Sequence, residues 1–100
     1  MNIQITSRKF KAKDSLKDYI NENVKSFEKF NDDILDVNVV LSFTHQKDSI
    51  KNVELNLHLP GKVLAVSTES DDFFKAINEA CDKMVIQLKK TKTKKLAIKR

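Results

Sequence analysis

The chain has 100 residues, of which 40% are hydrophobic and 33% are charged, and its formal net charge is +5. A chain of this length holds at most one domain, and its composition is that of a globular protein with one ordinary core. No apolar run approaches the roughly 20 residues of a membrane helix. A single glycine and a single cysteine exclude a glycine-rich phosphate loop and an internal disulfide.

The positive charge is concentrated at the C-terminus. The last twelve residues hold seven Lys and Arg and no acid, so the first 88 residues carry a net charge of −2. Concentrated positive charge favours a polyanion, either a nucleic acid or an acidic membrane surface. The first ten residues lack the apolar stretch of a signal peptide, and we therefore expect a cytoplasmic protein with a reduced thiol.

The first two predicted elements are a strand over 1–7 and a helix over about 14–29. Isoleucines alternate with polar residues in the first segment, which indicates a half-buried strand. In the second segment apolar residues recur every three or four positions, as in an amphipathic helix. They are Leu16, Tyr19, Ile20, Val24 and Phe27. Asp14 and Ser15 supply acceptors and negative charge for the first turn of this helix.

Three further strands are predicted. Alternation favours strands over 35–43 and 53–59, separated by a polar turn over 44–49. The apolar residues of the first of these are Leu35, Val37, Val39, Leu41 and Phe43. Pro60 and Gly61 then occupy the centre of a type II turn, which requires a positive φ at the glycine. The strand over 62–69 is partly apolar on both faces, so the sequence leaves its buried face open.

A last helix begins after Ser70-Asp71-Asp72, whose oxygens suit a helix N-terminus. Its predicted buried stripe is Phe74, Ile77, Cys81, Met84, Val85 and Leu88. The pattern fades near Lys90, so we expect one domain over 1–90 and a basic, flexible tail over 91–100. The order β-α-β-β-β-α predicts an α+β two-layer sandwich, in which both helices pack on one face of a four-stranded mixed sheet.

Order and residues together resemble the ribosome hibernation-promoting factors, a family also known as ribosome-associated inhibitor or protein Y. Residues 2–8 are similar to the family's first strand, and residues 16–20 and 27–30 to its first helix. The most specific stretch is 72–78, Asp-Phe-Phe-Lys-Ala-Ile-Asn, which resembles the start of the family's second helix. That match continues through Lys83, Gln87, Leu88 and Lys90, and the resemblance reaches about residue 92.

The resemblance implies a small factor of stress or stationary phase that silences ribosomes by binding, with no cofactor. Family members occupy the mRNA and tRNA channel of the small subunit at the A and P sites. The implied partners are the small ribosomal subunit with its 16S-type rRNA, the whole ribosome, and a separate ribosome modulation factor where ribosomes dimerise. The chain is similar to the short form of the family, and we expect the isolated protein to be monomeric.

Basic side chains outside the apolar stripes are the predicted RNA contacts, because A-form RNA is read mostly by its shape and phosphates. They are Arg8, Lys17, Lys25, Lys29, Lys75, Lys83, Lys89, Lys90, Lys92, Lys94 and Lys95. The alternative is a solvated lysine-rich surface with acids such as Asp18 and Glu79 among the lysines. Two positions depart from the resemblance, because Ile86 and Asn23 stand where relatives carry basic residues.

No residue pattern predicts an enzyme or a metal centre. Cys81 has the spacing of a core residue, and a nucleophile would need a basic partner. His45 and His58 are scattered and, with one cysteine, make no zinc ligand set. The acidic pairs 32–33 and 71–72 each precede a new element, which favours turn and capping roles. Four aromatic residues fall on predicted core stripes rather than on a base-stacking platform: Tyr19, Phe27, Phe43 and Phe74.

A stand-alone double-stranded-RNA-binding module, not specific to ribosomes, is the main alternative. It shares the packing of helices on a sheet and the lysines of a terminal helix, and it would bind free duplex RNA well. An RNA-recognition motif fits poorly, because it needs a strand after the second helix and aromatics on the open sheet face. A membrane-surface role of residues 89–100 is also weak, since only Leu96, Ala97 and Ile98 could insert.

Overall fold

The residues that the structure describes form four strands, two α-helices and one short 3₁₀ helix. The computed structural model describes the backbone of residues 1–44 and 50–98, and the side chains of residues 1–44 and 50–90. The strands are β1 (Asn2–Ser7), β2 (Asp36–Thr44), β3 (Ile50–Leu59) and β4 (Lys62–Ser70). Helix α1 (Asp14–Lys25) continues into the 3₁₀ helix η1 (Ser26–Lys29), and helix α2 (Phe73–Ile98) follows β4. The predicted element order is confirmed.

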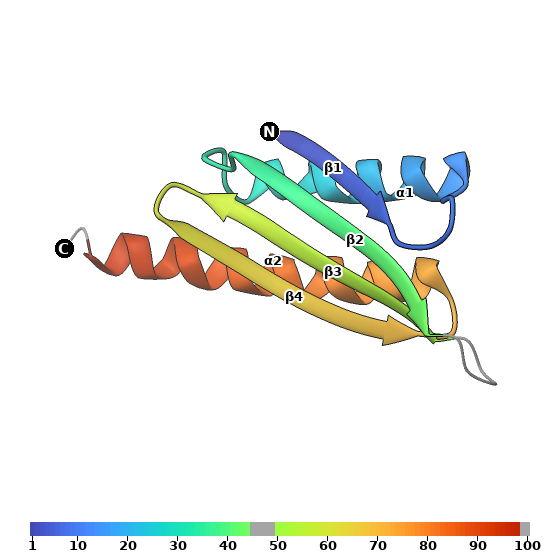
Figure 1. Ribbon diagram of the computed structural model, residues 1–100. Helices are drawn as coiled ribbons and strands as arrows, with labels where there is room; N and C mark the ends of the chain where they lie inside the picture. Colours follow the sequence, from blue (N-terminus) through green and yellow to red (C-terminus); the bar gives the residue numbers. More distant parts are fainter. Residues whose placement is uncertain (45–49, 99–100) are drawn as a thin grey trace.

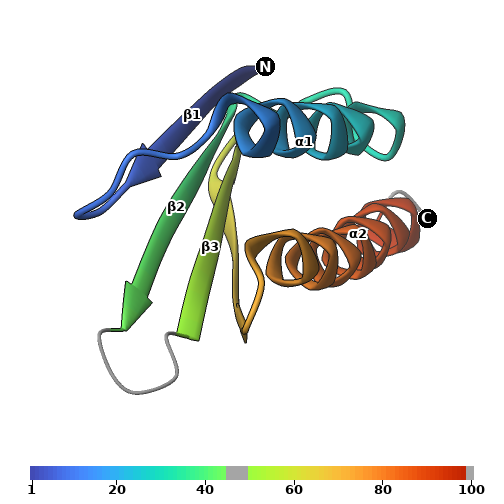
Figure 2. The same ribbon diagram turned by 90° about the vertical axis from the view of Figure 1, so that its right-hand side faces the viewer.

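The strands form one mixed sheet in the order β1-β2-β3-β4. β1 pairs parallel to β2, with Ile3 opposite Val37, and the other neighbours pair antiparallel. Figures 1 and 2 show α1 and α2 side by side on one face of this sheet, while the other face is open. The two-layer arrangement predicted from the order of the elements is therefore confirmed.

The core lies between the sheet and the two helices. Val37, Val39 and Leu41 of β2 have no exposed surface, as the alternation predicted. The buried face of β4, which the sequence left open, carries Leu64, Val66 and Thr68. The Thr68 hydroxyl donates a hydrogen bond of 2.7 Å to the carbonyl of Ala76, which connects β4 to the first turn of α2 and satisfies this buried polar group.

Two predictions about buried apolar residues are wrong. Leu35 was expected inside the strand, but β2 begins at Asp36 and the Leu35 side chain is 55% exposed. The period of two starts only where the strand starts, and the preceding Ile34 enters the core instead. Phe74 was expected in the buried stripe of α2, but it is 39% exposed. Its ring lies on the side of α2 that faces α1, where it meets the ring of Tyr19 edge-on.

The predicted side-chain capping is present at the start of α2 and absent at the start of α1. Asp72 accepts a hydrogen bond of 3.1 Å from the backbone N–H of Phe74, as expected of a capping residue. The N-cap of α1 is Lys13, with no side-chain capping bond, so Asp14 and Ser15 do not cap the helix as expected. Asp14 does place a negative charge in the first turn.

The last helix is longer than expected. α2 continues to Ile98 and extends past the hairpin of β3 and β4 in Figure 1, whereas the apolar pattern ended near Lys90. Residues 91–98 contain no Gly or Pro, and lysine is a good helix former, so nothing local ends the helix. The division into a domain over 1–90 and a flexible tail over 91–100 stays a prediction. The predicted turn at 44–49, with His45, lies outside the described residues apart from Thr44, which ends β2.

The turn between β3 and β4 gives a stability prediction. Gly61 has φ +72°, as the type II turn requires, and a Cβ at this position would meet nothing within 4 Å. Gly61→Ala should therefore lower the free energy of unfolding by about 1 kcal/mol through backbone conformation alone. Urea denaturation measures this loss, and Gly61→Asn is the control, because asparagine tolerates positive φ and should recover part of it.

Candidate nucleic-acid interface

Charge is distributed unequally between the two faces of the molecule. The open face of the described strands carries the carboxylates of Asp36, Glu54 and Glu69 and no Lys or Arg. Asp36 pairs across the strands with His58 on this face. The helices α1, η1 and α2 of the opposite layer (Figure 2) carry ten lysines and six Asp or Glu residues, which is a net charge of +4. A polyanion is therefore attracted to the helical layer and repelled by the open sheet face.

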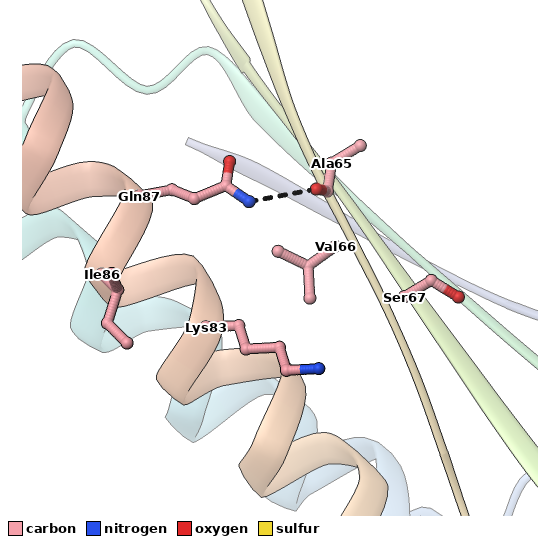
Figure 3. A pocket seen from close by; sticks show the side chains of 6 residues that line it. All are labelled: Ala65, Val66, Ser67, Lys83, Ile86 and Gln87. Carbon is pink, nitrogen blue, oxygen red and sulfur yellow. Dashed lines mark hydrogen bonds between the residues drawn. The ribbon is translucent and has the colours of Figure 1, made fainter.

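Lys83 and Lys90 lie on the flank of α2 that faces β4. Lys83, Ile86 and Gln87 line a groove of about 370 Å³ between the helix and β4, and the side chain of Gln87 donates a hydrogen bond of 3.2 Å to the carbonyl of Ala65 (Figure 3). Lys90 is seven residues after Lys83, about two helical turns, and therefore shares its side of the helix. Both lysines are exposed. We call this pair the α2 flank.

A second group of predicted contacts lies where α1 ends. Lys25 closes α1, Lys29 closes η1, and both are exposed. The ammonium group of Lys89 lies 5.6 Å from the centre of the Phe30 ring, next in sequence to Lys29. A cation over an aromatic ring is held in place without losing its charge. The fold thus brings Lys89 of α2 to the end of the first helix.

The loop that precedes α1 carries basic residues that were not among the predicted RNA contacts. Arg8 was predicted, but Lys9, Lys11 and Lys13 follow it in the loop between β1 and α1, and all four are exposed. Lys9 adopts a left-handed backbone conformation with φ 65°, which is uncommon for a residue with a side chain. The signal was present in the sequence, because residues 8–13 hold four basic residues and no acid.

The remaining predicted contacts belong neither to the α2 flank nor to the groups at the two ends of the first helix. Lys75 lies 3.7 Å from Asp71 in an exposed ion pair at the start of α2, and part of its charge is compensated there. Lys17 is half-buried, and because it is two residues before Tyr19, which faces α2, it points to nearly the opposite side of α1. Lys92, Lys94 and Lys95 follow on the helical backbone of α2, but their side chains lie outside the described residues.

Comparison with known proteins identifies the family. The model of the Sigma 54 modulation protein / S30EA ribosomal protein family matches residues 3–96. The chain belongs to this family. The S30EA family is the one that the resemblance of strand 2–8 and helix start 72–78 predicted, and the match covers nearly the whole chain.

Relatives and solved structures agree with the S30EA assignment. A ribosome hibernation promoting factor of Azotobacter vinelandii is 30% identical over 96 residues, which are 96% of this chain and 87% of the relative. A ribosome hibernation promotion factor of Bacillus subtilis is also 30% identical, but the chain spans only 50% of its length. A ribosomal subunit interface protein from Coxiella burnetii superposes with a TM-score of 0.83 at 26% identity, over 93% of this chain and 99% of that one. The N-terminal domain of Thermus thermophilus Protein Y has a TM-score of 0.80 at 28% identity, over 91% and 99% of the two chains.

The cysteine of this S30EA protein is a core residue. Cys81 is 7% exposed and belongs to the cluster that joins the sheet to α2. Burial of the thiol, with a smaller contribution from the neighbouring Asp82 carboxylate, raises the pKa of Cys81 from 9.0 to about 12. The thiol is therefore protonated at neutral pH and is a poor nucleophile. Within the described residues no three His, Cys, Asp or Glu side chains gather at one place, and no helix could cross a membrane.

The raised pKa predicts slow labelling and a pH-dependent stability. The native protein should react with a thiol reagent at pH 8 at least tenfold more slowly than the urea-unfolded protein, because the thiolate population falls about tenfold per pKa unit. The neutral thiol stabilises the fold fully below pH 9, and this contribution is lost as the pH rises toward 12. Comparing urea denaturation of the parent with Cys81→Ala across this range isolates the effect. Fast native labelling at pH 8 would contradict the burial of Cys81.

Proposed function

We propose that this protein binds the small ribosomal subunit and the whole ribosome in the cytoplasm, and that it inhibits translation while bound. It occupies the mRNA and tRNA channel at the A and P sites and contacts 16S-type rRNA through the basic surfaces of its helical layer. It acts under stress or in stationary phase, and a separate ribosome modulation factor joins it where ribosomes dimerise. The observation that carries the proposal is the family match over residues 3–96, together with relatives named for ribosome hibernation.

The charge distribution supports an orientation for this binding. Open-face positions of the described strands contribute three carboxylates and no Lys or Arg, whereas the helical layer carries the α2 flank and the Lys25, Lys29 and Lys89 group. Ribosomal RNA presents a dense phosphate surface, so the helical layer faces the RNA and the open sheet face points away from it. Binding of this kind makes and breaks no covalent bond, and an enzymatic role is not proposed.

The two departures from the resemblance have different structural settings. Asn23 is half-buried, and its side chain donates a hydrogen bond of 2.8 Å to the carbonyl of Tyr19, so it takes part in the packing of α1. Ile86 is 53% exposed and lies on the groove with Lys83. A basic residue at position 86 would extend the α2 flank, and its absence leaves an apolar gap between Lys83 and Lys90.

Sedimentation tests the proposal directly. The protein should migrate with small subunits and whole ribosomes in a sucrose gradient and should inhibit a cell-free translation system. A protein that stays at the top of the gradient at low salt, yet binds free duplex RNA, would contradict the proposal and support the double-stranded-RNA module. The comparison at two salt concentrations is needed because phosphate contacts weaken with salt.

Removal of residues 91–100 tests the contribution of the C-terminal segment. Five Lys and Arg are lost with it, so ribosome binding should weaken and its salt dependence should flatten by as much as about 4 in the logarithmic slope. The melting temperature should change little, since the last buried residue among the described side chains is Leu88. Unaltered affinity at every salt concentration would show that the segment makes no phosphate contact.

A further inference from the structure

A depression of about 300 Å³ lies at the end of the molecule where α1 and α2 both begin. The loop between β1 and α1 and the start of α2 meet there, far apart in sequence but at the same end in Figure 1. Its apolar wall is formed by Phe10, Leu16, Phe73 and Phe74, and Lys11 and Lys13 line it as well. We propose that this depression, the aromatic depression, binds one unstacked nucleotide of single-stranded RNA. The inference deepens the proposed function by naming the state of the RNA that is recognised.

The aromatic wall is held in place by ring packing. Phe10 stacks on Phe73 with ring centres 5.3 Å apart and planes inclined by 17°, and it meets Phe43 edge-on at the same distance. Phe74 contacts the ring of Tyr19, also edge-on, at 5.1 Å. Rings fixed in this way lose little freedom when a ligand arrives. Because Phe74 is 39% exposed, part of its surface is available to a base, and base–aromatic stacking tolerates every base.

The charges at the rim favour a phosphate beside that base. Lys11 and Lys13 are exposed, and neither forms an ion pair with any residue whose side chain the structure describes. Asp71 and Asp72 also line the depression; each makes a contact within the protein, and the Asp71 side chain is 82% exposed. Asp71 pairs with Lys75 at 3.7 Å and accepts from the Ser70 hydroxyl at 3.2 Å, while Asp72 caps α2. The lysines therefore remain available for an anion.

The volume of the aromatic depression limits the size of the ligand that it can hold. A volume of about 300 Å³ is at the lower end of small-molecule sites, which suits one nucleoside and is far too small for a duplex. A flat apolar wall with cations at its edge matches a base attached to a phosphate, and single-stranded RNA can turn a base out of its stack at low cost. The groove beside Lys83, in contrast, is lined by no aromatic residue, and it suits phosphates alone.

Fluorescence anisotropy with an eight-nucleotide single-stranded RNA tests the proposal, with a duplex of the same sequence as the second probe. Phe74→Ala should weaken single-strand binding by about 5- to 100-fold and leave duplex binding unchanged. Phe74→Tyr should retain it, because the ring is kept. Val63→Ala is the control, since Val63 is a 54% exposed apolar residue of β4 outside the depression. Lys11→Ala with Lys13→Ala should weaken binding and reduce its salt slope by about 1.4.

The proposal would be overturned if Phe74→Ala bound single-stranded RNA as tightly as the parent does. It would also be overturned if Phe74→Ala lost affinity for single-stranded RNA and for the duplex to the same extent. A loss in the lysine variant alone would also overturn it, in favour of phosphate attraction without base recognition. Cosedimentation with ribosomes separates this result from the proposed function. If the protein cosediments with ribosomes but has no affinity for single-stranded RNA, the proposal about the aromatic depression is wrong and the proposed function stands. If it binds single-stranded RNA through Phe74 but does not cosediment with ribosomes, the depression is supported and the proposed function is wrong.

Discussion

Reversing the charge of the α2 flank should weaken ribosome binding by about 100-fold or more at 0.1 M salt. Each phosphate contact changes the logarithmic salt slope by about 0.7 to 0.9, which corresponds to roughly a sixfold contribution at that concentration. Lys83→Glu with Lys90→Glu removes two such contacts and adds two repulsions. Both side chains are exposed, so the free energy of unfolding should change by no more than about 0.5 kcal/mol for each substitution. A sedimentation titration at two salt concentrations, with circular dichroism for the fold, measures both effects.

A charge-matched variant separates this flank from the overall charge of the protein. Asn2→Glu, Gln4→Glu, Thr6→Glu and Val63→Glu together also lower the net charge by four, at exposed positions of the open sheet face. If the helical layer faces the RNA, this control should retain most of the affinity. Equal losses in the two variants would show that net charge, and not the α2 flank, governs binding.

The gap at Ile86 provides the reciprocal test. Ile86→Arg should tighten ribosome binding by severalfold and steepen its salt dependence, because the new guanidinium lies between Lys83 and Lys90 on an exposed surface. Weaker binding in this variant would mean that the apolar side chain itself contacts the ribosome.

Phe27→Ala should cost about 3 to 5 kcal/mol of the free energy of unfolding. The Phe27 ring is the largest fully buried side chain among those that the structure describes, and it lies in η1 at the end of α1. Its loss removes apolar contacts and leaves a cavity, and in a protein of this size the melting temperature should fall by more than about 12 °C. Urea denaturation followed by circular dichroism measures the loss.

Phe74→Ala is the matched control for Phe27, because the same residue type is removed from a site that is 39% exposed. It should cost about 1 to 2 kcal/mol, from the apolar area that is buried and from the lost contact with Tyr19. Comparable losses for the two variants would mean that the open seam between the helices contributes as much to stability as the closed core does.

The sequence alone determined the element order, the polar and apolar faces of β1, β2, β3 and α1, the turn at Gly61 and the family. These features depend on interactions between near neighbours or on a repeated pattern, such as the period of two in Val37, Val39 and Leu41 or the period of 3.6 in the first helix. The capping of α2 by Asp72 is local in the same way, because donor and acceptor are two residues apart.

Only the tertiary structure decided which of these surfaces lie together. Phe27 and Phe74 both follow the apolar spacing of their helices, but they differ in burial. Phe27 is fully buried in the core, whereas Phe74 lies between α1 and α2 and is partly exposed. The faces of β4 were equally ambiguous until α2 covered Leu64 and Val66. Likewise, the loop lysines meet the start of α2 because the parallel pairing of β1 and β2 brings both helices to begin at one end of the sheet. Contacts across such distances along the chain leave no periodic trace in the sequence.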